Sequence, residues 1–192
     1  VSYNMMQRPT GIAIDRVSGT LYVVDTLASK ILVYSLDGKY IKSIGEYGGG
    51  IGQFNRPTFI ALGKEGNIYI TDSMNARVQI ISKEGKFVGK FGKRGTGTGD
   101  FANPRGIALD SEGHIYVTDT IFEAVQIFDK SGQLLLVFGR QGTKHGEFAL
   151  PAGISVSRDD KIYVADSYNM RVQVFGYLKK SQLENNGSQQ KK

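Results

Sequence analysis

The sequence contains no cysteine, only two histidines and no long apolar run, and these shortages exclude several classes of protein. Without cysteine the chain has neither a disulfide framework nor a thiolate metal site or nucleophile, and the redox compartment stays undetermined. No window approaches the about 18 apolar residues that a membrane-spanning helix needs, and the first residues lack the charged-then-apolar pattern of a signal peptide. The 192 residues are enough for one domain with its own core.

The chain also lacks the apolar spacing of an amphipathic helix. Its apolar residues occur instead in short runs rich in β-branched and aromatic side chains, separated by turn residues such as those at 111–113 and 129–132. In the third quarter of the chain these runs predict strands at 106–109, 114–118, 124–128 and 134–138. Four short strands joined by hairpin turns are typical of one antiparallel sheet.

All four prolines occupy one position of an internal repeat, because they lie 47 or 48 residues apart. A tyrosine and an aspartate recur with the same spacing. The repeated residues are Pro9, Pro57, Pro104 and Pro151; Tyr22, Tyr69, Tyr116 and Tyr163; and Asp25, Asp72, Asp119 and Asp166. A four-stranded sheet at this period indicates propeller blades. The sequence therefore predicts an all-β fold: a β-propeller built of four-stranded antiparallel blades, with four repeats within residues 1–178.

Half of the formal charge of +6 belongs to the last fourteen residues of the chain. Four of the lysines fall within residues 179–192 beside a single glutamate, so that segment carries +3 and the rest of the chain only +3. This distribution predicts a polar, basic, disordered tail over 179–192 and gives little support to a dedicated polyanion site.

The order of motifs within each repeat resembles the NHL repeat. In the third repeat the motifs are Pro-Arg-Gly-Ile-Ala-Leu-Asp (104–110), Gly-His-Ile-Tyr-Val-Thr-Asp (113–119), Val-Gln-Ile-Phe-Asp (125–129) and Phe-Gly-Arg-Gln-Gly (138–142). The resemblance extends over residues 8–175 and implies a β-propeller, usually of six blades, used mainly as a binding platform. It also favours an extracytoplasmic protein, periplasmic or on the cell surface.

The number of blades follows from the ends of the repeat array. The fourth repeat shows no fourth strand after Phe175, as expected of a last blade that an N-terminal strand completes. We therefore expect the last four blades of a six-bladed propeller, with upstream blades missing or supplied by another chain. The alternative is a four-bladed ring in which residues 1–6 provide the closing strand.

The repeated aspartate is predicted to be structural. It follows the second strand of each repeat, where a carboxylate can accept backbone N–H bonds in the turn and can pair with a cation five residues later. Such pairs are expected between Asp72 and Arg77 and between Asp166 and Arg171. A catalytic residue is rarely needed in every blade.

The turns after the second strand and the loops between repeats are expected to share one face of the propeller. Candidate binding residues on that face are apolar or basic, a mixture typical of partner surfaces: Leu27, Met74, Ile121, Phe122, Tyr168, Arg94, Arg105 and Arg140. The phenylalanines that precede each repeat are expected to fill the gaps between blades: Phe54, Phe101 and Phe148.

These features favour a non-enzymatic binding or scaffold module that recognises a protein or carbohydrate through this face, with no cofactor and no metal. One alternative is RNA binding, as in NHL propellers attached to tripartite-motif proteins, although cations hardly exceed carboxylates here. Another is a lactonase-like or lyase-like enzyme with a metal in the central channel. His114 and His145 occupy non-equivalent repeat positions, which argues against a histidine metal centre of the peptide-amidating lyases.

Overall fold

The computed structural model describes residues 6–177, and each sequence repeat forms its own antiparallel sheet. Blade 1 contains β1 (Pro9–Asp15), β2 (Thr20–Asp25), β3 (Lys30–Ser35) and β4 (Tyr40–Ile44). Blade 2 contains β7 (Pro57–Leu62), β8 (Ile68–Asp72), β9 (Arg77–Ile81) and β10 (Phe87–Phe91). Blade 3 contains β11 (Pro104–Leu109), β12 (Ile115–Asp119), β13 (Ala124–Phe128) and β14 (Leu134–Phe138). Blade 4 contains β15 (Pro151–Val156), β16 (Ile162–Asp166) and β17 (Arg171–Phe175) within the described residues.

The strands of every blade pair in sequence order through short hairpins. Proline is the first residue of each first strand, a position where its missing N–H is tolerated. A β-bulge or other register irregularity follows each of these prolines, as between Pro57 and Ile60. The repeated proline therefore marks the start of a blade.

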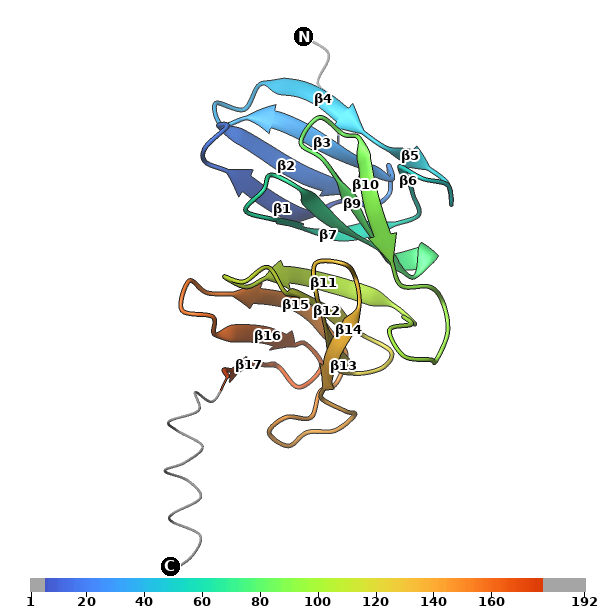
Figure 1. Cartoon of the computed structure of the whole chain (residues 1–192), viewed down its shortest axis with the longest axis vertical. Coiled ribbons are helices and arrows are strands. Elements are labelled where there is room, and N and C mark those ends of the chain that lie inside the picture. The colour runs from blue at the N-terminus through green and yellow to red at the C-terminus, as the bar shows by residue number, and fades with distance from the viewer. Residues whose placement is uncertain (1–5, 178–192) are drawn as a thin grey trace, which may run out of the picture.

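The blades follow one another along the chain and contact each other in turn (Figure 1), with first strands β1, β7, β11 and β15 in successive contact. The repeated tyrosine shows how they pack. Tyr22 of blade 1 lies in one buried cluster with Ile60 and Ile70 of blade 2, and Tyr116 of blade 3 lies with Val164 of blade 4. The tyrosines of blades 1 to 3 thus fill the interfaces with the following blades, where a buried side chain of this size contributes about 1.5–3 kcal/mol.

The outer faces of the first and fourth blades have no such cover within residues 6–177. Ile12 of blade 1 is 64% exposed, whereas Ile60 at the same position of blade 2 is 6% exposed. In blade 4, Val172 and Val174 are 62% and 56% exposed. The two inner blades supply most of the buried core.

The predicted all-β propeller with four repeats is confirmed, and most strand bounds agree to within a residue or two. Strands β13 and β14 have the predicted bounds, β11 begins earlier than predicted at Pro104, and β12 ends later at Asp119. Three short elements were not predicted: the parallel pair β5 (Glu46–Tyr47) and β6 (Gln53–Phe54), and a 3-10 turn, η1 (Ser73–Asn75). The predicted tail over 179–192 and the alternative closing strand over 1–6 lie outside the described residues, apart from Met6.

Candidate functional site on the loop face

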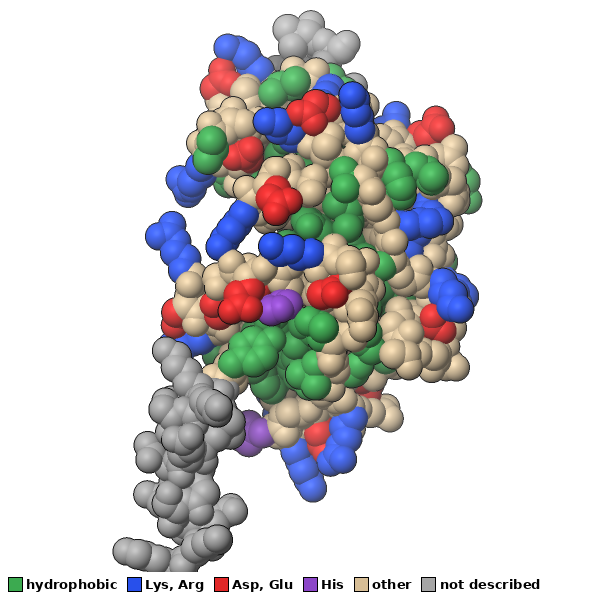
Figure 2. All heavy atoms as spheres, viewed as in Figure 1, with side chains coloured by type: hydrophobic (Ala, Val, Ile, Leu, Met, Phe, Trp, Pro, Cys, Tyr) green, Lys and Arg blue, Asp and Glu red, His purple; other side chains and the backbone are tan. Residues whose placement is uncertain are grey.

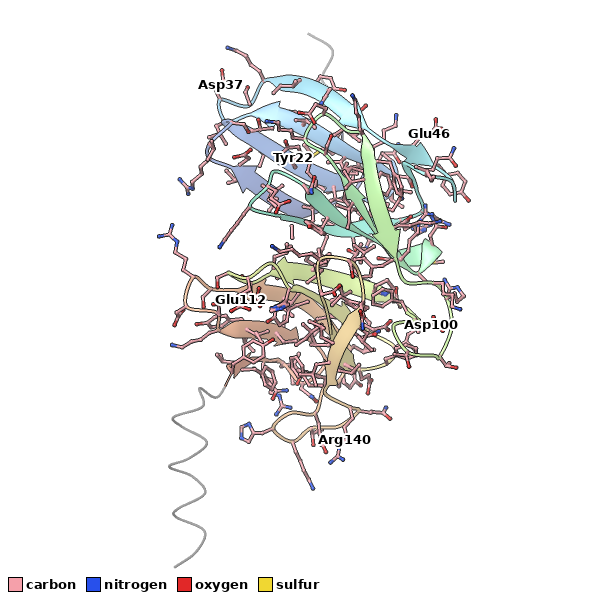
Figure 3. The ribbon with its side chains drawn as sticks, in the orientation of Figure 1. Tyr22, Asp37, Glu46, Asp100, Glu112 and Arg140 are labelled. Atoms are coloured by element: carbon pink, nitrogen blue, oxygen red, sulfur yellow. The ribbon has the colours of Figure 1, made fainter. Side chains whose placement is uncertain are left out.

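The loops between blades lie on one side of the molecule, together with the turns that join the second and third strands of each blade. The hairpins that join the first to the second strand and the third to the fourth lie on the other side. In Figure 3, Glu46 and Asp100 from the inter-blade loops lie opposite Asp37 and Glu112 from the hairpins. We call the side with the inter-blade loops the loop face. It comprises the turns 26–29, 73–76, 120–123 and 167–170, and the inter-blade loops 45–56, 92–103 and 139–150.

The buried aspartate of blade 2 organises its part of the loop face. The Asp72 side chain is fully buried, and its Oδ1 accepts a hydrogen bond from the backbone N–H of Asn55 at 2.7 Å. Its Oδ2 accepts bonds from Asn75 Nδ2 and Arg77 Nε, each at 2.8 Å. The carboxylate therefore joins the turn after β8 to the incoming inter-blade loop of the same blade.

Arg77 completes this clamp from the other side of the loop. Its guanidinium donates to the carbonyl oxygens of Gly49 at 2.9 Å, Gly50 at 2.7 Å and Gln53 at 2.9 Å. Planar guanidinium groups suit such multiple acceptors because their N–H donors are held in a fixed fork. We call this set, from Asp72 to the loop carbonyls, the Asp–Arg clamp.

Blade 4 repeats the clamp with the same atoms. Arg171 Nε donates to Asp166 Oδ2 at 2.8 Å, and its terminal nitrogens donate to the carbonyls of Thr143 at 2.7 Å, Lys144 at 2.6 Å and Glu147 at 2.9 Å. Burial opposes ionisation of Asp166, but hydrogen bonds from the backbone N–H of Ala149 and from nearby side chains hold its pKa below the ordinary value.

In blades 1 and 3 the partners of the aspartate are backbone N–H groups alone. Asp25 accepts bonds from the N–H groups of Gln7, Arg8 and Ala28. Asp119 accepts bonds from the N–H groups of four residues: Ala102, Asn103, Ile121 and Phe122. Within the described chain neither carboxylate forms an ion pair. The aspartate thus ties turn to loop in every blade, with or without an arginine.

Hydroxyl groups beside the aspartates connect successive blades, which sequence reasoning missed. The hydroxyls of Thr26, Ser73 and Thr120 donate to the carbonyls of the next blade's proline, at 2.6, 2.6 and 3.0 Å. The available signal was a serine or threonine directly after the aspartate in all four repeats.

The four turns of the loop face have an exposed apolar residue at one shared repeat position, the second residue after the aspartate. Leu27 is 45%, Met74 51%, Ile121 63% and Tyr168 74% exposed. Phe122, the neighbour of Ile121, is partly buried. Each of the four turns therefore presents an apolar side chain to solvent at this position. The loop face also has exposed apolar residues outside the shared position: Tyr47, Ile51, Leu150 and Met170.

The three predicted arginines lie in different surroundings. Arg94 is exposed and donates to the carbonyls of Met74 and Ala102. The Arg140 side chain is 80% exposed and pairs with Glu147 at 3.0 Å. The prediction that Arg105 belongs to a loop is wrong: it lies in β11, partly buried, and its Nε has no hydrogen-bond partner among the described residues.

The three phenylalanines before the blades are fully buried. Phe101 packs between Phe91 of blade 2 and Phe128 of blade 3, with ring centroids 6.4 and 5.5 Å away. A glycine precedes each ring in the loop, and a Cβ on Gly92 would lie 2.4 Å from the Phe101 ring. The rings fix the base of the loop face.

A second polar cluster lies away from the loop face, and the sequence did not reveal it. Asp110 Oδ2 is 2.8 Å from His114 Nδ1 and accepts a hydrogen bond from the Tyr116 hydroxyl at 2.8 Å, which is itself 2.7 Å from the Tyr177 hydroxyl. Figure 2 shows a histidine among acidic side chains on this side. A cavity of about 490 Å³ adjoins the cluster, between Asp160 and the apolar Leu135 and Leu136.

Two members of this cluster, Asp110 and Tyr116, have shifted pKa values. Burial opposes ionisation of Asp110, yet hydrogen bonds from His114 and Tyr116 hold its pKa below the usual value. Burial and hydrogen bonds with Tyr177 and Asp110 raise the pKa of Tyr116. The carboxylate therefore orients the imidazole. Within residues 6–177 no group of three His, Cys, Asp or Glu side chains is placed to hold a metal ion.

Comparison with known families decides the assignment. A model described as 6-bladed beta-propeller matches residues 9–74 and 63–121, and a model of the NHL repeat matches residues 148–175. The chain belongs to the NHL-repeat β-propellers. The resemblance predicted from the repeat motifs is confirmed. The described part of this NHL-repeat propeller contains no helix long and apolar enough to cross a membrane.

Solved structures agree with the fold of this NHL-repeat propeller. A streptogramin B lyase matches with a TM-score of 0.66 at 15% identity, over 94% of this chain and 58% of its own. A virginiamycin B lyase from Staphylococcus aureus matches with a TM-score of 0.62 at 20% identity, over 94% of this chain and 59% of its own. An auxiliary nutrient binding protein from Bacteroides thetaiotaomicron matches with a TM-score of 0.67 at 14% identity, over 88% of this chain and 48% of its own.

At these identities the likeness concerns the fold alone. The chain spans between about half and three fifths of the length of these three structures. No curated protein matches the sequence.

Proposed function

We propose that this NHL-repeat propeller is a non-enzymatic binding or scaffold module whose loop face recognises a protein or carbohydrate partner. The observation that carries the proposal is the set of four exposed apolar side chains at one repeat position: Leu27, Met74, Ile121 and Tyr168. Exposed apolar side chains framed by polar groups are typical of interaction surfaces.

The turns that carry these side chains are held before any partner arrives. In blade 4 the backbone N–H of Tyr168 donates to the carbonyl of Ala149, and Asp166 holds the same turn from within. In blade 2 the N–H of Met74 donates to the carbonyl of Asn55. Fixed turns lower the conformational cost of association, which is about 0.5–1.5 kcal/mol for each side chain that binding immobilises.

The structural relatives leave room for both binding and catalysis. One is described as an auxiliary nutrient binding protein and two as lyases. A binding role is supported because exposed apolar side chains lie on the loop face beside carboxylates that hold its turns and loops.

The test uses a phage-displayed random peptide library and a glycan microarray as probes of the full chain. Binders selected with the unaltered protein are then measured against an Ile121→Ser/Tyr168→Ser variant. We expect at least tenfold weaker binding, the equivalent of about 1.4 kcal/mol. The matched control is Val17→Ser/Leu36→Ser, which removes two exposed apolar residues from hairpins, 100% and 54% exposed. Failure to select any binder, or equal losses in both variants, would contradict the proposal.

A further inference from the structure

Blade 3 keeps the loop that an arginine clamps in blades 2 and 4, but it has no arginine there. Ala124 occupies the position of Arg77 and Arg171, and Phe122 occupies the position of Asn75 and Asn169. In those blades the asparagine donates to a loop carbonyl, from Asn75 to Gly48 and from Asn169 to Gly142, each at 2.9 Å. Blade 3 therefore lacks both side-chain donors of the clamp.

The loop of blade 3 nevertheless has the same internal hydrogen bonds as the clamped loops. The N–H of Gly97 donates to Asp100 Oδ2 at 2.9 Å, as that of Gly50 does to Gln53 Oε1. The N–H of Asp100 donates to the carbonyl of Gly97 at 3.1 Å, and the side chain of Gln126 donates to the carbonyl of Asp100 at 2.8 Å. The fold of the loop thus persists without the guanidinium.

The loop of blade 3 therefore keeps the backbone carbonyls that an arginine guanidinium binds in blades 2 and 4. The carbonyls equivalent to those bound by Arg171 belong to Thr96, Gly97 and Asp100. Within the described residues no side chain donates to the first two. These three residues line a cavity of about 510 Å³ together with Phe122, Ala124 and Gln126.

The charge around this cavity favours a cation. Asp100 lines the cavity and is 9% exposed. Asp119 and Glu123 belong to the adjoining turn and are 0% and 9% exposed, and Glu123 Oε2 has no hydrogen-bond partner among residues 6–177. None of the three carboxylates forms an ion pair among residues 6–177. Arg140 also borders the cavity, but its charge is already paired with Glu147. Buried carboxylates without a counter-ion attract a cation more strongly than exposed ones do.

We propose that the blade 3 cavity binds a guanidinium group supplied from outside the chain. The inference rests on the proposed function, because the cavity opens among the loops of the same face, and it names the chemistry that one partner would present. A planar guanidinium reaches several fixed carbonyls at once, whereas an ammonium is a compact, strongly hydrated charge. The face of Phe122 adds a surface on which a guanidinium can stack.

The first test is a titration of the full chain with N-methylguanidinium. Binding is monitored by NMR through the backbone amide resonances of Gly97 and Gly99 and the side-chain amide resonance of Gln126. Saturable shifts are expected, and methylammonium at equal ionic strength is expected to bind at least about tenfold more weakly, since its compact ammonium cannot reach the fixed carbonyls together. Equal binding of the two cations, or no saturation, would overturn the proposal. This comparison needs no variant.

Two variants sharpen the result. Ala124→Arg supplies the blade's own guanidinium and is expected to abolish the shifts, whereas Arg171→Ala opens an equivalent cavity in blade 4 and is expected to add saturable shifts at Thr143 and Lys144. If Arg171→Ala shows saturable shifts with N-methylguanidinium in blade 4 but none in blade 3, the proposed site in blade 3 is refuted. Undiminished binding by a folded Ala124→Arg protein would do the same.

The source of the guanidinium is distinguished with free arginine and with a short arginine peptide beside its neutral citrulline counterpart. Tighter binding of the arginine peptide than of arginine identifies a protein partner, and the reverse identifies a small guanidino ligand. Ile121→Ser/Tyr168→Ser separates this inference from the proposed function, because it removes the apolar tips and leaves the cavity. Loss of selected binders with retained N-methylguanidinium binding supports both. Loss of selected binders, when neither the unaltered protein nor the variant binds N-methylguanidinium, supports the loop-face function while refuting the cavity. Undiminished selected binders with retained N-methylguanidinium binding refute the role of the apolar tips and leave the cavity.

Discussion

Replacing Arg77 by methionine is the sharpest test of the Asp–Arg clamp. The Arg77 side chain is 7% exposed and that of Asp72 is 0% exposed, so solvent cannot compensate for the lost charge. The variant leaves the buried carboxylate without its cation and the carbonyls of Gly49 and Gly50 without their side-chain donor. Removing one partner of a buried ion pair costs roughly 3–5 kcal/mol. We expect the free energy of unfolding to fall by that amount.

Arg171→Met is the matched comparison, because Arg171 makes the same four hydrogen bonds but its side chain is 27% exposed. Water can solvate the groups that it leaves, so a smaller loss of about 1–3 kcal/mol is expected. Urea unfolding followed by far-UV circular dichroism measures both losses.

A double-mutant cycle with Asp72→Asn isolates the pair itself. Asp72→Asn/Arg77→Met is expected to be more stable than the sum of the two single losses predicts, because no buried charge remains. Equal losses for Arg77→Met and Arg171→Met, or strictly additive losses in the cycle, would refute the argument from burial.

Three further predictions concern a loop glycine, acid stability and RNA. Gly92→Ala is expected to lose more stability in thermal unfolding than Gly38→Ala, because both have positive φ, at +80° and +85°, but only the former places a Cβ 2.4 Å from a phenylalanine ring; equal losses would contradict this. The lowered pKa of Asp166 means that its carboxylate stabilises the fold above its unfolded pKa of about 3.9 and that this stability is lost as pH falls through the folded pKa. Unfolding of the wild type and Asp166→Asn is therefore expected to differ at pH 5 and to converge toward pH 2, and a constant difference would count against it. Single-stranded RNA is expected to show no saturable binding in a fluorescence salt titration, since the Arg140 charge is already paired; tight binding that weakens steeply with salt would favour the RNA alternative.

The repeat positions made the fold accessible from the sequence. Pro57 and Tyr69 recur because each blade needs the same bulged first strand and the same side chain against the next blade. Asp72 recurs because each incoming loop has N–H groups that need an acceptor. Such requirements repeat with the blade, so spacing alone reveals them.

Other features of the structure depend on which blades meet and have no signature in spacing. Tyr116 and Tyr177 are 61 residues apart in sequence, and only the stacking of blades 3 and 4 brings their hydroxyls within 2.7 Å. The sequence places Arg105 in a loop, because local propensity does not show where β11 begins. The structure pairs Pro104 with Asp119, so β11 already includes Arg105. The departure from the repeat at Ala124 was visible in the sequence, but the cavity beside it was not.

The Asp–Arg clamp also makes the loop and turn of blade 2, and those of blade 4, a self-contained unit. Its partners are an incoming loop and a turn of one blade, as with loop 45–56 and the turn after β8. A loop and its turn can therefore be exchanged together, by recombination or by grafting, without altering the clamp of a neighbour. The contacts to match at the new junctions include a buried phenylalanine such as Phe54, which packs with Ile31 and Ile44 of blade 1, and a hydroxyl such as that of Ser73, which donates to a proline carbonyl. The same frame can thus acquire new specificity one blade at a time.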